Sequence, residues 1–272
     1  MNRKLPLNHA LAFGWTFGAT SCLLWLARLS VAVRPTSATD VVQIGAIEAL
    51  VFVMAILGVL GLHGRDVPLS ASLGLRPTHA LLIALGLGLG FAAHFPAELV
   101  DTVTRKFLPD SAQDLAREAA LLSAASPLRL VVVLLVIACV GPLVEELFFR
   151  GALFGALRQG HSLVAAASTT AACFVLGHLD YRRWPALVVV AIVLSHLRAA
   201  SGSLLPSLAM HVAFNAVTVL AFFIRPGSTT ADSMGTLPGV VGSVATAVLM
   251  LSVQAVASRA DAARVGRLED AE

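Results

Sequence analysis

Long runs of apolar residues, separated by short polar stretches, dominate the pattern along this chain. Eight such runs are present, at residues 10–27, 41–62, 80–95, 130–144, 162–177, 184–197, 204–224 and 237–256. Four of them fall below about 17 residues, the lower limit for an apolar helix that spans a membrane. Each short run therefore either continues as helix beyond its first polar residue or lies among other helices. The pattern predicts an all-α fold, a polytopic transmembrane helix bundle of about eight spans.

Composition and charge favour a multi-pass protein of the cell membrane, with the lipid bilayer as a partner. Of the 272 residues, 57% are hydrophobic and 13% are charged, against about 25% charged residues in soluble domains. The net charge of +3 gives no reason to expect nucleic-acid binding, because the arginines mark the ends of apolar runs and form no patch. Cys22, Cys139 and Cys173 lie within apolar runs without metal-type spacing, so we expect small core residues and no disulfide framework.

The first apolar run could belong to a cleaved signal peptide or to a retained helix. The chain begins with the positively charged MNRK, and TSA at 36–38 could mimic a cleavage site. The apolar part exceeds the usual signal-peptide core of about 7–15 residues, which favours a retained helix. Eight spans place both termini on one side of the membrane. The 19 Lys and Arg residues divide almost evenly between the two sides, so they favour cytoplasmic termini only weakly.

Three regions follow from the pattern: N-terminal transmembrane helices at 1–95, a helical core at 96–225, and a last transmembrane helix with a polar, solvated tail at 226–272. Within the core, residues 111–125 predict an amphipathic helix on the membrane surface. Ser111, three residues before Asp114, gives this helix a start that resembles a capping box. The segment is either a simple connector or a lid or guide beside a substrate entrance.

Two adjacent glutamates end the fourth apolar run, in the sequence GPLVEELFFRG. Glu146 and Arg150 are four residues apart and share a helix face, which predicts an ion pair. Glu145 points about 100° away from Glu146 and is left without that partner. A carboxyl group in such a place could take up and release protons near neutrality. The alternative is that both carboxylates cap a solvated helix end, and this motif alone does not decide between the two.

Two further polar clusters lie in apolar helices. His178 ends the fifth run, one turn after Phe174, and His211 lies one turn before Asn215 inside the seventh run. A His–Asn pair inside a spanning helix is costly unless other helices supply partners, so these residues favour a functional site. The other histidines do not require a functional role. We expect positions at the membrane interface for His63, His79, His161 and His196, and the role of His94 stays open.

These three clusters, EExxxR, FxxxH and HxxxN in this order on successive membrane helices, resemble the CPBP family of intramembrane proteases, also called ABI or CAAX-protease-like. The resemblance covers roughly residues 110–225 and rests on Glu145, Glu146, Arg150, Phe174, His178, His211 and Asn215. Each motif is weak by itself, but the ordered set is specific. The sixth run departs from the family because it lacks glycines that are often found there.

The resemblance implies an endopeptidase that hydrolyses a peptide bond in a membrane-associated protein or peptide. Glu145 and His178 would hold and deprotonate the attacking water. His211 and Asn215 would donate hydrogen bonds to the oxyanion, and Glu146 with Arg150 would support the site together with Phe174. No cofactor is expected on this mechanism, and trimming of prenylated CAAX proteins is implied by the family name alone.

Other functions stay open at this point. A zinc metalloprotease could use Glu145, His178 and His211 as ligands with one open position. The chain lacks the H-E-x-x-H motif, and Asn215 suits an oxyanion better than zinc, so the metal-free mechanism is favoured. A non-catalytic membrane scaffold or immunity protein is a further alternative. A transporter with repeated halves is disfavoured, because no second copy of the motifs is present.

Overall fold

The structure, a computed structural model, describes residues 5–64, 68–122, 126–224 and 236–269. The all-α prediction is confirmed, since the described residues form helices and no strand. The elements are α1 (His9–Val33), η1 (Pro35–Thr39), α2 (Val41–His63), α3 (Leu69–Ser72), α4 (Ala80–Ala92), α5 (His94–Phe107), α6 (Ala112–Leu122), α7 (Pro127–Val133), η2 (Leu134–Val140), α8 (Gly141–Glu146), η3 (Leu147–Leu153), α9 (Phe154–Leu157), α10 (Leu163–Gly177), α11 (Trp184–Ser201), α12 (Leu205–Ile224) and α13 (Thr236–Glu269).

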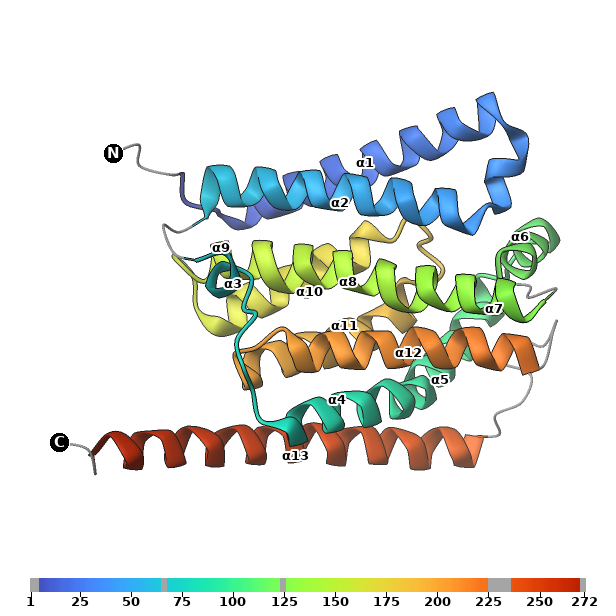
Figure 1. The fold of residues 1–272 in the computed structure, drawn as a ribbon. Coiled ribbons are helices and arrows are strands. Elements are labelled where there is room, and N and C mark those ends of the chain that lie inside the picture. Colours follow the sequence, from blue (N-terminus) through green and yellow to red (C-terminus); the bar gives the residue numbers. More distant parts are fainter. Residues whose placement is uncertain (1–4, 65–67, 123–125, 225–235, 270–272) are drawn as a thin grey trace.

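The helices form one bundle whose long axes run in nearly the same direction (Figure 1). Within the described part of the chain, seven helical segments are long and apolar enough to cross a membrane. The shorter apolar helix α10 runs alongside them, so seven long spans are found where about eight were predicted. The α1–α2 hairpin covers one flank, α4 and α13 cover the other, and α7 to α12 lie between (Figure 1).

Two small-residue positions fix the place of α12, the helix that carries two predicted site residues. Gly86 and Gly90 on α4 face α12 so closely that a Cβ atom at either would collide with its backbone, near Pro206 and Met210. Side chains larger than hydrogen would push the two helices apart, which explains the glycine pair four residues apart. These two glycines therefore mark a close helix contact between α4 and α12.

Three expectations about helix limits need correction or confirmation. The third apolar run ends near residue 95, but the helical span continues beyond it, because α5 extends to Phe107. Pro96 lies in the first turn of α5, where a missing backbone N–H breaks no helical hydrogen bond. The tail expected after residue 256 instead continues as helix α13 to Glu269. The capping box is confirmed, since the Ser111 hydroxyl accepts from the Asp114 backbone N–H at 3.1 Å and the Asp114 carboxylate accepts from Ser111 in return.

Two expectations about burial need correction: the core position of the cysteines and the interfacial position of His63. Only Cys173 is buried, while Cys22 and Cys139 lie on the outside of the bundle, where a bilayer would cover apolar side chains. His63 is buried instead of interfacial, with its Nδ1 2.9 Å from the Leu5 carbonyl oxygen. His94, left undecided, donates to the Phe214 carbonyl oxygen at 2.9 Å and stacks on the Phe214 ring, which makes it a structural residue.

The start of α1 and the C-terminal end of α13 lie at the same end of the bundle (Figure 1). We therefore expect reporters fused at the N-terminus and after Arg259 to report the same side of the membrane. Paired alkaline phosphatase and fluorescent-protein fusions measure this directly. Reporters on opposite sides would contradict an even number of crossings.

Candidate active site

The predicted ion pair of Glu146 and Arg150 is present at the centre of the bundle. Arg150 Nη1 donates to Glu146 Oε1 at 2.9 Å, and both side chains are fully buried, with 0% exposure. The Arg150 guanidinium also lies 4.4 Å from the centre of the Phe174 ring. From the other side, Arg198 Nε donates to the Arg150 carbonyl oxygen at 2.9 Å. This pair is therefore a structural support that water does not reach.

We expect Glu146→Gln to reduce folded protein, because the change leaves the Arg150 charge buried without its partner. Removing one member of a buried pair costs about 3–5 kcal/mol of unfolding free energy. The measurements are the yield of folded protein in detergent and its thermal unfolding midpoint. The double variant Glu146→Gln, Arg150→Gln removes both charges and should be more stable than either single variant. Equal or lower stability of the double variant would contradict the pairing.

Glu145 lies apart from this pair and faces two histidines. Its Oε1 is 4.0 Å from His178 Nε2, and its Oε2 is 3.6 Å from His211 Nε2. The Glu145 side chain is 13% exposed and that of His178 is 33% exposed, whereas Glu146 is completely enclosed. Water can therefore reach the first glutamate and not the second. The two neighbours occupy different environments, as their 100° separation on the helix predicts.

The backbone fixes the orientation of His178. Its Nδ1 lies 2.9 Å from the Phe174 carbonyl oxygen, which can only accept, so Nδ1 carries the proton of this hydrogen bond. In the neutral ring, Nε2 is then an acceptor directed toward Glu145. Trp184 Nε1 donates to the His178 carbonyl oxygen at 2.5 Å and holds the residue where α10 ends. A lone histidine at a helix end is thus fixed by contacts on two helices.

Phe174 packs between the histidines and the buried pair. Its ring centre is 4.7 Å from that of His178 and 5.6 Å from that of His211. His211 is 5% exposed, and its Nδ1 lies 3.4 Å from Glu146 Oε1, longer than the 2.7–3.2 Å of an ordinary N–H···O hydrogen bond. The conspicuous phenylalanine of the second motif therefore holds both imidazoles beside the carboxylates.

Asn215 lies on the same helix face as His211 and points toward the fourth span. Its Nδ2 donates to the Ile137 carbonyl oxygen at 3.0 Å. Ile137 belongs to η2, a π-helical segment in which the backbone departs from the α-helical hydrogen-bond pattern. The amide group has two donor hydrogens, so this bond orients Asn215 and leaves one hydrogen for a ligand.

Glu48 on α2 is a site residue that the sequence analysis missed. It lines the same cavity as Glu145 and Asn215. A Cβ atom at Gly141 would sit 3.5 Å from Glu48 Oε2, so the glycine leaves room for this carboxyl group against α8. Glu48 is the single charged residue within the second apolar run, and intramembrane carboxylates are functional by default. That signal could have identified it.

A cavity of about 220 Å³ is lined by Glu48, Glu145 and Asn215 together, and neither histidine is among its lining residues. It is lined by Val41, Ile44, Gly45, Glu48, Leu121, Val136, Ile137, Gly141, Pro142, Glu145 and Asn215. Leu121 comes from the amphipathic helix α6, so the helix at the end of the bundle forms part of the wall of the cavity (Figure 1). The cavity therefore has carboxyl and amide groups on one side and apolar side chains on the other.

Two ion pairs hold α6 against the loop between α10 and α11. Arg182 Nη1 lies 2.7 Å from Asp114, and Arg183 Nη2 lies 2.6 Å from Glu118. The hydrogen bond from Arg182 lowers the pKa of Asp114 to about 2, from an ordinary value near 3.8. A carboxylate with a lowered pKa is fully ionised above its ordinary value and loses the interaction as the pH falls toward 2. The attachment of α6 is therefore constant across the physiological range.

The same residues can be tested as a zinc site. Zinc lies about 2.0–2.2 Å from nitrogen and oxygen ligands and needs three protein ligands around one point. Within the part of the chain that the structure describes, no group of three or more His, Cys, Asp or Glu side chains is placed to share a metal ion. In this arrangement Glu145, His178 and His211 do not fit a zinc centre.

The fold and the site define a multi-pass helical membrane protein with a buried cluster of carboxyl, imidazole and amide groups. Residues 127–217 match the family described as type II CAAX prenyl endopeptidase Rce1-like. The match contains all three motifs and confirms the resemblance of this segment to the CPBP, or CAAX-protease-like, family. It covers about a third of the chain and leaves α2, with Glu48, outside. No curated protein and no solved structure matches the chain significantly.

Proposed function

We propose that this protein is an intramembrane endopeptidase that hydrolyses a peptide bond in a membrane-associated protein or peptide. One observation carries the proposal: Glu145 Oε1 lies 4.0 Å from His178 Nε2. Glu145 also lines a cavity together with Asn215. The distance between Glu145 and His178 is too long for a direct hydrogen bond but suits a water molecule that bonds to both groups.

In the proposed mechanism, Glu145 takes a proton from this water as its oxygen attacks the scissile carbonyl carbon. The C=O π electrons move to oxygen and give a tetrahedral intermediate. Asn215 and His211 donate hydrogen bonds to the oxyanion, a contribution of about 3–4 kcal/mol for each donor in acyl-transfer enzymes. Collapse of the intermediate breaks the C–N bond, and the proton held by Glu145 passes to the leaving amine. The products are a new carboxyl terminus and a new amino terminus.

Glu48 has a positioning role in this proposal. Glu48 and Glu145 line one cavity, where two ionised carboxylates would repel each other strongly. We therefore expect the two groups to share one proton. With the proton on Glu48, its hydroxyl donates to Glu145 and leaves Glu145 as the ionised base. The α2 helix would thereby control the charge of the catalytic group on α8.

We expect Glu48→Gln to keep activity within about tenfold of the unchanged protein, because the glutamine amide still donates a hydrogen bond to Glu145. The informative measurement is the pH profile of kcat/KM. In the unchanged protein, kcat/KM should change at the pH where the pair loses its shared proton; in Glu48→Gln this step of the profile should disappear or move. A parallel profile in both proteins would contradict a shared proton, whatever the effect on rate.

The proposed function is tested by comparing the termini of membrane proteins in cells that carry the unchanged protein or Glu145→Gln. We expect a set of new amino termini in or beside transmembrane segments that depends on Glu145. If neither these termini nor any peptide cleavage by the purified protein depends on Glu145, the non-catalytic scaffold or immunity role becomes the better explanation.

A further inference from the structure

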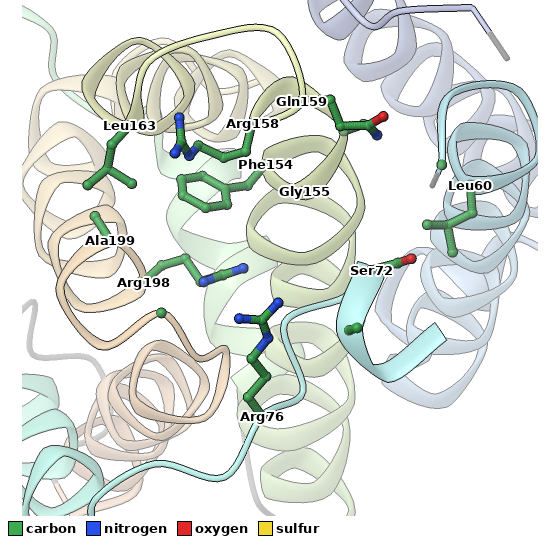
Figure 2. Close-up of a pocket in the computed structure, with 14 residues that line it drawn as sticks. Leu60, Ser72, Arg76, Phe154, Gly155, Arg158, Gln159, Leu163, Arg198 and Ala199 are labelled. Carbon is green, nitrogen blue, oxygen red and sulfur yellow. The ribbon is translucent and has the colours of Figure 1, made fainter. Parts of the chain in front are cut away.

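A second, larger cavity lies at the end of the bundle that holds the start of α1, away from α6. Its volume is about 380 Å³, within the roughly 300–1,000 Å³ typical of ligand sites. Arg76, Arg158 and Arg198 line it from three different segments: the loop before α4, the end of α9 and the end of α11. Figure 2 shows the Arg76 and Arg198 side chains extending toward each other, with the Phe154 ring between Arg198 and Arg158. We name this cavity the arginine pocket after these three residues.

The charge of the arginine pocket is not balanced by the described residues around it. Its lining contains no aspartate or glutamate, and no ion pair among the described residues includes any of its three arginines. At the opposite end of the bundle the arginines have carboxylate partners, as in the pairs of Arg34, Arg105, Arg182 and Arg183. Three guanidinium groups around one cavity without a described counter-charge favour an anionic ligand.

Arg198 is fixed in place before any ligand binds. It is 6% exposed, its Nε donates to the Arg150 carbonyl oxygen at 2.9 Å, and its guanidinium lies 4.6 Å from the centre of the Phe154 ring. These contacts use Nε and one face of the group. Its two terminal nitrogens make no hydrogen bond to any described side chain or backbone group. Because Arg198 lines the cavity, these nitrogens are available to a ligand there.

The backbone around the arginine pocket is also specific. Gly74 has a left-handed φ of 70°, and a Cβ atom there would collide with the Arg198 guanidinium. The loop can therefore pass over Arg198 only with glycine at this position. Ser203 Oγ donates to the Arg76 carbonyl oxygen at 2.7 Å, which ties the loop to the turn between α11 and α12. The site is therefore built from fixed parts and is more than a set of surface arginines.

We propose that the arginine pocket binds a phosphate group, supplied by the headgroup of an anionic phospholipid. Guanidinium groups match the geometry of phosphate oxygens, and basic pockets between helices at a membrane surface are suited to anionic headgroups. Leu60, Phe154 and Leu163 provide apolar contact for the glycerol and acyl portion beside the charge. Free phosphate has the same chemistry and is the alternative source. This proposal does not depend on the proposed peptidase function.

The test uses the full-length protein, purified in neutral detergent and depleted of lipid. Short-chain phosphatidylglycerol, short-chain phosphatidylcholine and inorganic phosphate are titrated separately, and the thermal unfolding midpoint is followed. A ligand of the folded state raises this midpoint in proportion to its affinity. We expect phosphatidylglycerol to raise it with saturation and phosphatidylcholine to have little effect. The double variant Arg76→Gln, Arg158→Gln should bind about 100-fold more weakly, since each lost charged contact costs about tenfold.

The matched control is the double variant Arg117→Gln, Arg259→Gln, which removes two exposed arginines outside the arginine pocket. It should bind phosphatidylglycerol within about twofold of the unchanged protein, the level expected when no contact is lost. An equal loss in both double variants would show a general charge effect and overturn the proposal, as would an equal response to the two lipids. A saturable response to inorganic phosphate that needs Arg76 and Arg158 would support the phosphate site and assign the free anion as its source.

Discussion

Glu145→Gln is expected to fold normally and to lose about a thousandfold or more of its peptidase turnover. Glutamine keeps the size and hydrogen-bonding capacity of the side chain but cannot accept the proton of the attacking water. A positioned general base contributes about 10²–10⁴ in rate, and the neighbouring carboxyl group of Glu48 holds a proton in the proposed mechanism and does not replace Glu145 as the base. The measurement is cleavage of a membrane peptide by purified protein, with the thermal unfolding midpoint recorded on the same sample.

Glu118→Gln is the matched control for this change. Glu118 lies on α6 and pairs with Arg183, outside the lining of the candidate active site. The same chemical change there should leave turnover within a few-fold of the unchanged protein, because exposed ion pairs contribute about 0–1 kcal/mol. Full activity of Glu145→Gln would overturn its assignment as the base. Equal loss in both variants would indicate that the arrangement of α6 and not the base limits the reaction.

The site was predictable from the sequence where its geometry is local. The spacing of Glu146 and Arg150 places them on one helix face. The rest of that helix is apolar near them, so each is the nearest opposite charge for the other. The same argument separates Glu145 from the pair. His211 and Asn215 are likewise placed on one face by their spacing of four residues. In each case one helix, known from its apolar pattern, is enough to determine the neighbours.

Glu48 could not be placed in this way, because its partner lies on another helix. Only the packing of α2 against α8, with Gly141 at the contact, brings it to the cavity that Glu145 lines. The arginine pocket is similar: Arg76, Arg158 and Arg198 are far apart in sequence and meet through tertiary structure. A single sequence identifies such residues as costly in their surroundings but does not show which partners offset that cost.

The polytopic helix bundle was predictable, while the exact number of long spans and several details of the helices were not. Apolar runs set the crossings, because a bilayer requires a minimum length of apolar helix. The continuation of α5 beyond Pro96 depends on the proline falling in a first turn, which the apolar pattern does not reveal. The outward position of Cys22 and Cys139 shows a related limit. In a membrane, lipid-facing and core-facing positions are both apolar, so hydrophobicity alone does not identify the core.

Asn215→Ala is expected to lower kcat about 100- to 1000-fold with a smaller effect on KM, as for the loss of one oxyanion donor. The structure adds a second effect, because Asn215 Nδ2 also donates to the Ile137 carbonyl oxygen. Thermal unfolding of the variant measures that contribution separately from the rate. An unchanged kcat would remove Asn215 from the oxyanion site.

Metal content measured beside this activity distinguishes the proposed mechanism from the zinc alternative. The metal-free mechanism predicts that purified protein stays active after treatment with a chelator, and that activity does not follow bound zinc. A catalytic zinc ion would instead be held by its ligands through purification, at about one ion per chain. If removal of stoichiometric zinc abolished cleavage and its return restored cleavage, the hydrolytic water would have to be bound to metal. In that case the site would have to bring Glu145, His178 and His211 closer around one point than the structure places them. Asn215 would lose its proposed role, while the two histidines and Glu145 would remain in the site.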